Sequence, residues 1–209
     1  MKPTSNNTIH PILIGITGGI GSGKSYICHQ LEQTGHHVFY CDDVAKQIIR
    51  TQADVKRELT ALVGPDVYDA AGQLVKSVLA AYLCRGTDYS HRIDQIVHPR
   101  VAAAFKQQAA LLRPSTPATL ECDEKVISLQ LLQQLPTDGV LFMECALLFE
   151  SGFDQLVDKS VVVHVSQETQ LKRLIGRDHI SREKALRWIS LQLAEDVKVD
   201  RADYVINNE

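Results

Sequence analysis

Short runs of apolar and β-branched residues recur along the chain, and polar or helical segments separate them. They predict five strands, at Ile12–Thr17, Val38–Cys41, Val140–Glu144, Ser160–Val165 and Tyr204–Ile206. A helix is predicted at Lys24–Gln33, directly after the first strand. Strands that alternate with helices indicate the α/β class, with a parallel sheet covered on both faces. In such a sheet, ligands gather at the carboxyl ends of the strands.

A predominantly helical stretch begins at Asp42–Thr51 and runs to about Leu112. His98-Pro99 interrupts it, and because the residue before a proline is pushed out of the helical region, we expect a helix to end there as a structural hinge. Residues 113–138 contain prolines and polar clusters around a predicted helix at Lys125–Leu135. They are interpreted as a surface excursion.

Composition excludes several classes of protein. A chain of 209 residues with 44% hydrophobic residues can bury one substantial core. Its net charge of −3 lacks the basic excess of a protein that coats nucleic acid or an anionic membrane, so neither partner is expected. Its five cysteines form no CxxC pair, which argues against disulfides and structural zinc. Without a signal-peptide core or a membrane-spanning run, a cytoplasmic location is expected.

Residues Gly18 to Ser25, GGIGSGKS, match the pattern G-x-x-x-x-G-K-[ST] at every fixed position. The motif follows a predicted strand and opens a predicted helix, which is the context that it requires. Its glycines let backbone N–H groups converge on an anion, and the helix N-terminus adds partial positive charge. We expect Lys24 to reach the β and γ phosphates of a nucleoside triphosphate and the Ser25 hydroxyl to bind Mg²⁺. The predicted nucleotide contacts are Gly19, Ile20, Gly21, Ser22, Gly23, Lys24, Ser25 and Tyr26.

The rest of the sequence narrows the class of phosphate-loop protein. No guanine-reading N-K-x-D tetrapeptide occurs, which argues against a GTPase, and the D-x-x-G match at Asp69 to Gly72 is interpreted as a turn. A short chain with a large helical insert after the second strand favours a small-molecule kinase over an ATPase motor.

Further motifs occur in a characteristic order: GITGGIGSGKS, VFYCDDVAK, IVHPRV, ECALLFESGFD, ETQLKRLIGRD and ADYVINN. Together they resemble dephospho-CoA kinases over nearly the whole chain. The resemblance implies transfer of the γ-phosphate of ATP to the 3′-hydroxyl of the dephospho-CoA ribose. It also implies the P-loop kinase fold, a five-stranded parallel sheet flanked by helices, with a helical acceptor domain and a small helical lid. The corresponding ranges are a core of 1–42, 139–170 and 196–209, an acceptor domain of 43–112, the excursion of 113–138 and a lid of 171–195.

Asp42 lies just past the second predicted strand, where its carboxylate is expected to face the phosphate loop and accept the proton of the acceptor hydroxyl. The family's catalytic aspartate falls on this position. Asp43 is the competing candidate, and the alternative for either carboxylate is a helix cap. The sequence departs from the family pattern at Tyr40, where another acid is frequent, and at Lys46, where arginine is frequent. Lys46 is retained as a substrate contact.

Glu144 ends the third predicted strand, where an acidic side chain is suited to hold Mg²⁺ together with Ser25. The alternative is a structural hydrogen bond. The resemblance places Glu150, His98 and Arg100 near the acceptor, and His98 and Arg100 are expected to contact its phosphates.

Residues 172–201 hold eight Lys or Arg against five acids, in a chain that is acidic overall. Arg173 and Arg177 are four apart on one predicted helix, so both project from one face, as catalytic residues of a lid that closes over a triphosphate would. The alternative is an exposed basic face paired with Glu168 and Asp178.

Two rival functions remain open at this stage. One is a kinase of the same architecture that acts on a nucleoside, nucleotide or other metabolite. The other is a nucleotide-dependent switch that hydrolyses slowly and acts through partners. The sequence does not indicate an oligomeric state.

Overall fold

A computed structural model describes residues 9–209 of the chain, and they divide into two compact units. The core unit extends to Phe39 and resumes from Gln108 to Glu209. The helical unit comprises Tyr40–Gln107. The phosphate loop and the lid segment therefore belong to the core unit, and Asp42 belongs to the helical unit.

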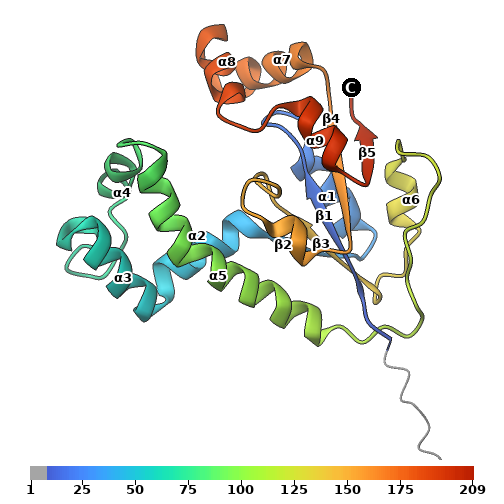
Figure 1. The fold of residues 1–209 in the computed structure, drawn as a ribbon, viewed down its shortest axis with the longest axis horizontal. Coiled ribbons are helices and arrows are strands. Elements are labelled where there is room, and N and C mark those ends of the chain that lie inside the picture. The colour runs from blue at the N-terminus through green and yellow to red at the C-terminus, as the bar shows by residue number, and fades with distance from the viewer. Residues whose placement is uncertain (1–8) are drawn as a thin grey trace, which may run out of the picture. The chain divides into compact units, whose positions relative to one another are not determined.

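The core unit is built on a five-stranded parallel sheet with the order β2-β3-β1-β4-β5 (Figure 1). The strands are β1 Ile12–Thr17, β2 His37–Tyr40, β3 Val140–Glu144, β4 Lys159–His164 and β5 Tyr204–Asn207. All five residues of β3 are buried, as expected of a strand covered on both faces. The predicted fold class is confirmed, and the predicted strands differ from the observed ones by one residue at most at each end.

Helices cover the sheet and form residues 171–195, the segment that is predicted to be a lid. In the core unit they are α1 Lys24–Gln33, α6 Leu129–Gln133, α7 Gln167–Asp178, α8 Arg182–Ser190 and α9 Glu195–Arg201, with the short 3-10 helix η2 Phe153–Leu156. α1 packs on β1 and β3, and α9 packs on β4. α7 and α8 pack on each other through the buried side chains of Leu171, Leu174 and Ala185.

The topology determines where the phosphate loop lies. β1 is the central strand and pairs with β3 on one side and β4 on the other. Strands β2 and β3 therefore lie on one side of β1, and β4 and β5 lie on the other. Where the strand order reverses in this way, a crevice opens at the carboxyl ends of the strands. The loop that follows Thr17 lies at this point, between the ends of β3 and β4.

Residues 113–138 pack against the core more closely than a surface excursion suggests. Leu120, Ile127 and Leu132 are buried. Val126 forms a parallel bridge with Val205, so this segment pairs with β5. The helix predicted at Lys125–Leu135 is only α6, Leu129–Gln133, because the residues before it are extended along the sheet edge.

The helical unit contains α2 Cys41–Thr51, α3 Ala53–Val63, α4 Lys76–Leu83, the 3-10 helix η1 Pro65–Val67 and most of α5 Thr87–Leu111. The expectation that a helix ends at His98-Pro99 is wrong, because α5 continues through Pro99. Buried side chains recur every four residues along α5, at Ile93, Val97, Val101 and Phe105. This apolar face spans the proline on both sides, and its packing outweighs the local preference against helix.

Candidate active site

The phosphate loop connects β1 to α1, as its motif predicts. Gly21 and Gly23 have φ angles of 81° and 93°, a left-handed conformation that favours glycine. Ser22 N–H donates to Gly19 O at 3.0 Å, which closes a tight turn inside the loop. The sequence folds this way because residues with side chains cannot make these turns without strain.

Lys24 extends back along the loop. Its Nζ donates to Gly18 O at 3.0 Å, so the ammonium group lies at the first residue of the motif. Ser22 Oγ is buried and meets no hydrogen-bond partner among residues 9–209. A buried hydroxyl rarely goes without a partner, so this atom is suited to a polar ligand in the loop.

Arg173 and Arg177 both lie on α7, but they have different partners. Arg173 Nη1 donates to Ser22 O at 3.2 Å, and its Nη2 donates to Asn208 O at 2.8 Å. Arg177 forms an ion pair with its neighbour Asp178, with 2.7 Å between Nη2 and Oδ2. That hydrogen bond raises the pKa of Arg177 and lowers the pKa of Asp178. Arg173 therefore contacts the loop backbone, whereas Arg177 is paired at the end of the helix.

The two acidic residues predicted in the core unit lie at the end of β3 and in the segment that follows it. Glu144 is the last residue of β3, is buried, and lies in register with Ile16 of β1. Glu150 Oε1 accepts a hydrogen bond from Leu193 N–H at 3.0 Å, which connects the segment after β3 to the end of the lid. Glu144 therefore lies at the carboxyl ends of the central strands, where ligands gather in a parallel sheet.

Three of the site residues predicted in the helical unit, Lys46, His98 and Arg100, have acidic partners within that unit. Asp42 lies in the first turn of α2, directly after β2. Lys46 donates to Asp43 Oδ1 at 2.9 Å, and this hydrogen bond raises the lysine pKa. His98 Nε2 lies 3.4 Å from Asp94 Oδ1. Arg100 binds Asp54 Oδ2 at 2.8 Å and also Glu58, so it connects α5 to α3 and lowers the pKa of Asp54.

Four residues that the sequence did not predict as site residues lie at the phosphate loop. Gln192 Oε1 accepts from the Ile20 N–H at 2.7 Å, and Asn208 Nδ2 donates to Ser22 O at 2.8 Å. Gln170 and Glu195 lie against Gly19, where an added Cβ would come within 2.4 Å and 2.9 Å of their side chains. Gln170 and Asn208 lie within the motifs ETQLKRLIGRD and ADYVINN, but those motifs do not indicate a contact with the loop, and Gln192 and Glu195 lie outside such motifs.

A pocket of about 740 Å³ lies beside these residues, between α7, α8 and the start of α9. His164, Gln170, Gln192 and Glu195 are among the residues that line it. His164 ends β4, so the pocket opens at the carboxyl ends of the strands, next to the phosphate loop. Its position fits a ligand whose phosphates occupy the loop.

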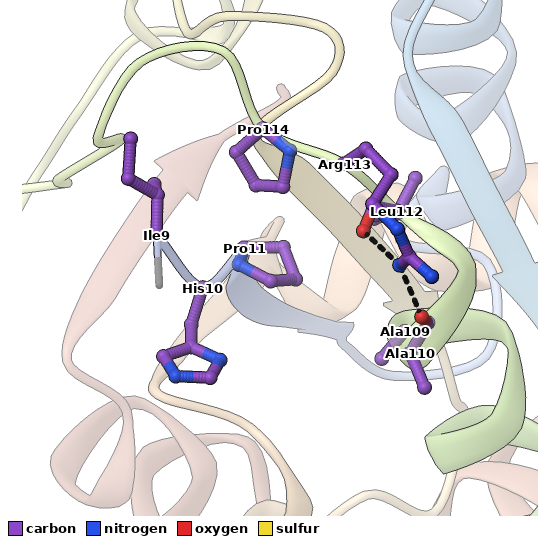
Figure 2. Close-up of a pocket in the computed structure, with 8 residues that line it drawn as sticks. All are labelled: Ile9, His10, Pro11, Ala109, Ala110, Leu112, Arg113 and Pro114. Carbon is purple, nitrogen blue, oxygen red and sulfur yellow. Dashed lines mark hydrogen bonds between the residues drawn. The ribbon is translucent and has the colours of Figure 1, made fainter. Parts of the chain in front are cut away.

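A second pocket, of about 600 Å³, lies at the other end of β1 (Figure 2). Ile9, His10 and Pro11, which precede β1, form one wall. The other wall is formed by Ala109, Ala110, Leu112, Arg113 and Pro114. The Arg113 guanidinium bonds to backbone carbonyls of its own segment, as the dashed lines show. Because the phosphate loop follows the opposite end of β1, this pocket does not belong to the candidate active site.

Within residues 9–209, every helix is too short or too polar to cross a membrane.

A family model described as dephospho-CoA kinase matches residues 12–122 and 125–209. A dephospho-CoA kinase of Bacteroides fragilis is 35% identical over 198 residues, which cover 95% of this chain and 85% of the relative. One of Chlorobium luteolum is 34% identical over 205 residues, with 96% and 84% covered.

Two solved structures are similar in fold. The crystal structure of TT1252 from Thermus thermophilus has a TM-score of 0.72 and 28% identity, and the match covers 96% of this chain and 90% of that chain. A dephospho-CoA kinase from Campylobacter jejuni has a TM-score of 0.60 at 20% identity, with 94% and 88% covered.

Proposed function

This chain belongs to the dephospho-CoA kinase family, and from that membership we propose that it transfers the γ-phosphate of ATP to the 3′-hydroxyl of the dephospho-CoA ribose. The observation that carries the proposal is the phosphate loop at the carboxyl end of β1, with Lys24 Nζ placed at Gly18 O. A glycine loop with its lysine in this position suits a nucleotide's β and γ phosphates. The cytoplasmic location remains a prediction.

We assign Mg²⁺ to Ser25 and Glu144. A hydroxyl and a carboxylate are oxygen ligands of the kind that Mg²⁺ prefers, and both residues adjoin the loop in which Ser22 Oγ is left without a protein partner among residues 9–209. When bound, the ion would neutralise charge on the phosphates. Gly19, Ile20, Gly21, Ser22, Gly23, Lys24, Ser25 and Tyr26 are the proposed nucleotide contacts.

In the proposed reaction, Asp42 accepts the proton of the 3′-hydroxyl while the oxygen of that hydroxyl forms a bond to the γ-phosphorus. The bond between that phosphorus and the bridging oxygen breaks, and ADP leaves. Lys24, Arg173 and Arg177 stabilise the charge on the transferred group. Arg173 already bonds to the loop, whereas Arg177 must exchange Asp178 for phosphate to act in this way.

Lys46, His98, Arg100 and Glu150 are proposed to contact the acceptor. Arg100 is the cation with the strongest competing interactions, since Asp54 and Glu58 both bind it. We therefore assign its main contribution to the geometry of α3 and α5, with the acceptor's phosphates as a second partner.

The proposal is tested by measuring ATP consumption with dephospho-CoA, adenosine, AMP or no acceptor, and by confirming the product mass. A gain of one phosphate on dephospho-CoA alone supports it. Turnover only with another acceptor would indicate a different kinase of the same fold, and stimulation only by a macromolecule would indicate a switch.

Asp42→Asn and Asp43→Asn separate the two candidates for the base. The first is expected to lower kcat by at least about a hundredfold while ATP affinity is kept, which is the usual contribution of general-base catalysis. The second is expected to leave kcat within about threefold, because Asp43 pairs with Lys46 on the surface. The reverse pattern would assign the base to Asp43.

A further inference from the structure

The lid holds Ile20 of the phosphate loop through both its backbone and its side chain. The Ile20 N–H donates to Gln192 Oε1 at 2.7 Å. The Ile20 side chain packs against the buried cluster of Leu171, Leu174 and Ala185, which joins α7 to α8. The loop and the lid therefore share an attachment point at this residue.

The attachment point lies two residues after Gly18, which Lys24 contacts, and so in the part of the loop that is expected to bind the terminal phosphate. Lys24 Nζ donates to Gly18 O, and the lysine of this motif reaches the β and γ phosphates. Ile20 follows Gly18 by two residues, ahead of the glycines that lead into α1. A movement of the lid that is transmitted through its contacts with Ile20 therefore acts first on the part of the loop expected to bind the γ-phosphate.

The segment that leaves the lid, residues 192–198, is anchored to the core at successive positions. Leu193 N–H donates to Glu150 Oε1 at 3.0 Å, and Glu195 Oε1 lies 3.4 Å from His164 Nδ1. Lys198, which is fully buried, has its Nζ 4.0 Å from Glu195 Oε2. These contacts restrict the movement of Gln192 relative to the core, so the Gln192 amide stays at the loop.

We propose that Gln192 is a positioning residue that couples the lid to the terminal phosphate of the nucleotide. Its amide oxygen fixes the Ile20 N–H, and with it the γ-phosphate end of the loop, in the geometry that phosphoryl transfer requires. Because the same side chain ties the lid to the loop, it also keeps the lid over the terminal phosphate and excludes water. The proposal rests on the phosphotransferase function proposed above and adds a residue that acts on ATP but not on ADP.

The test compares Gln192→Met, which keeps the length of the side chain but removes the acceptor oxygen, with the native protein. Binding of ADP and of a non-hydrolysable ATP analogue is measured by calorimetry. ADP affinity should stay within about twofold, and the ATP analogue should bind about fivefold to tenfold more weakly, the effect of one lost hydrogen bond. In turnover, the ratio of acceptor-independent ATP hydrolysis to transfer should rise about tenfold.

Leu191→Ala is the matched control, because Leu191 precedes Gln192 and is 78% exposed. It should change neither the nucleotide affinities nor the ratio. Equal weakening of ADP and the ATP analogue would overturn the proposal in favour of general support of the loop. Tighter binding of the ATP analogue would show that Gln192 competes with phosphate, and unchanged values would show no role, so either result overturns it.

Two precautions keep the test decisive. If Gln192→Met does not fold, Gln192→Leu carries it, since that variant also removes the acceptor oxygen. It should spare ADP and weaken the ATP analogue as Gln192→Met does, and equal effects on both would again overturn the proposal. The binding comparison uses no acceptor, so a failure to phosphorylate dephospho-CoA would refute the proposed function without deciding the role of Gln192.

Discussion

Gly23 and Gly176 are glycines of the core unit with opposite requirements. Gly23 has a φ of 93°, and an added Cβ would lie 2.3 Å from Asn208 Nδ2. Gly176 is helical, and an added Cβ would meet no atom within 4 Å among residues 9–209. Gly23→Ala should weaken ATP binding by more than about tenfold through backbone strain. Gly176→Ala should stabilise the protein by about 0.5–1 kcal/mol.

Nucleotide titration and thermal unfolding of the two variants check this pair of expectations. The result that would contradict it is native ATP affinity in Gly23→Ala. Loss of stability in Gly176→Ala would show that α7 requires the glycine for a reason other than space.

Lys198 is a buried cation whose charge the fold tolerates at an energetic cost. Its burial lowers its pKa, although Glu195 and Glu150 partly oppose the effect. The folded-state pKa is therefore below the unfolded value of about 10.4. Below the folded pKa, the ammonium is charged in both states and the full desolvation cost is present. That cost disappears as the pH rises through the two pKa values, because the group is then neutral in both states.

Lys198→Met removes this cost and should therefore be at least as stable as the native protein at pH 7. Its advantage should shrink as the pH rises from the lowered folded-state pKa of the lysine to the unfolded value of about 10.4, because the native lysine loses its proton over that range. Denaturant unfolding at several pH values measures the difference. A less stable variant at pH 7 would show that the ion pair with Glu195 outweighs the cost of burial. An advantage that is independent of pH would show that it comes from packing and not from the removed charge.

At the scale of elements, α5 shows a helix that packing maintains through a proline. Pro99 has no N–H to donate to the carbonyl of Gln95, and its ring crowds that carbonyl. Pro99→Ala should stabilise the protein by about 1–2 kcal/mol, because alanine restores the backbone hydrogen bond and removes the clash. The gain is limited because alanine also gives the unfolded chain more conformational freedom. Urea unfolding measures it, with Ala103→Pro on the same helix as the reverse control. Ala103→Pro should cost about 3 kcal/mol, and a destabilised Pro99→Ala would mean that the packing requires the proline.

The elements that the sequence predicted well are those that local pattern determines. The helix at Lys24–Gln33 and the strands at Ile12–Thr17 and Val140–Glu144 match the structure at both ends. Each has a continuous apolar run or a motif beside it. The continuation of α5 through Pro99 was missed because the buried face that overrides the proline is a tertiary feature.

The candidate site likewise contains residues that local sequence pattern predicts and residues that it does not. The phosphate loop is a contiguous motif, and its place after β1 follows from eight residues. Gln192 and Asn208 reach that loop from 172 and 186 residues away in the chain, so local pattern cannot predict their contacts with it, although Asn208 lies in the ADYVINN motif. The partners of Arg173 and Arg100 were likewise not predictable, because four-residue spacing gives the face of a helix but not the group that it meets.

At the scale of the whole chain, the sheet has an outer strand, β5, that residues 113–138 cover. Val205 N–H donates to Lys125 O at 2.8 Å, and Ile127 N–H donates to Val205 O at 2.9 Å. Tyr204 Oη adds a bond to Leu120 O at 3.1 Å. Figure 1 shows α6 and its flanking segment beside β5. An uncovered edge strand can pair with another chain, so we infer that this segment protects the sheet from self-association.

Ile127→Pro tests that inference, because proline removes the N–H that pairs with Val205 while Val126→Pro leaves both ladder bonds in place. Ile127→Ala accounts for the loss of the buried side chain alone. Static light scattering at increasing protein concentration should show self-association of Ile127→Pro well beyond both controls. Association of Ile127→Ala to the same extent would attribute the effect to core packing, and association of Val126→Pro would attribute it to proline itself. Since covering the edge requires only backbone groups, many sequences could do it, which explains why the segment carries no motif.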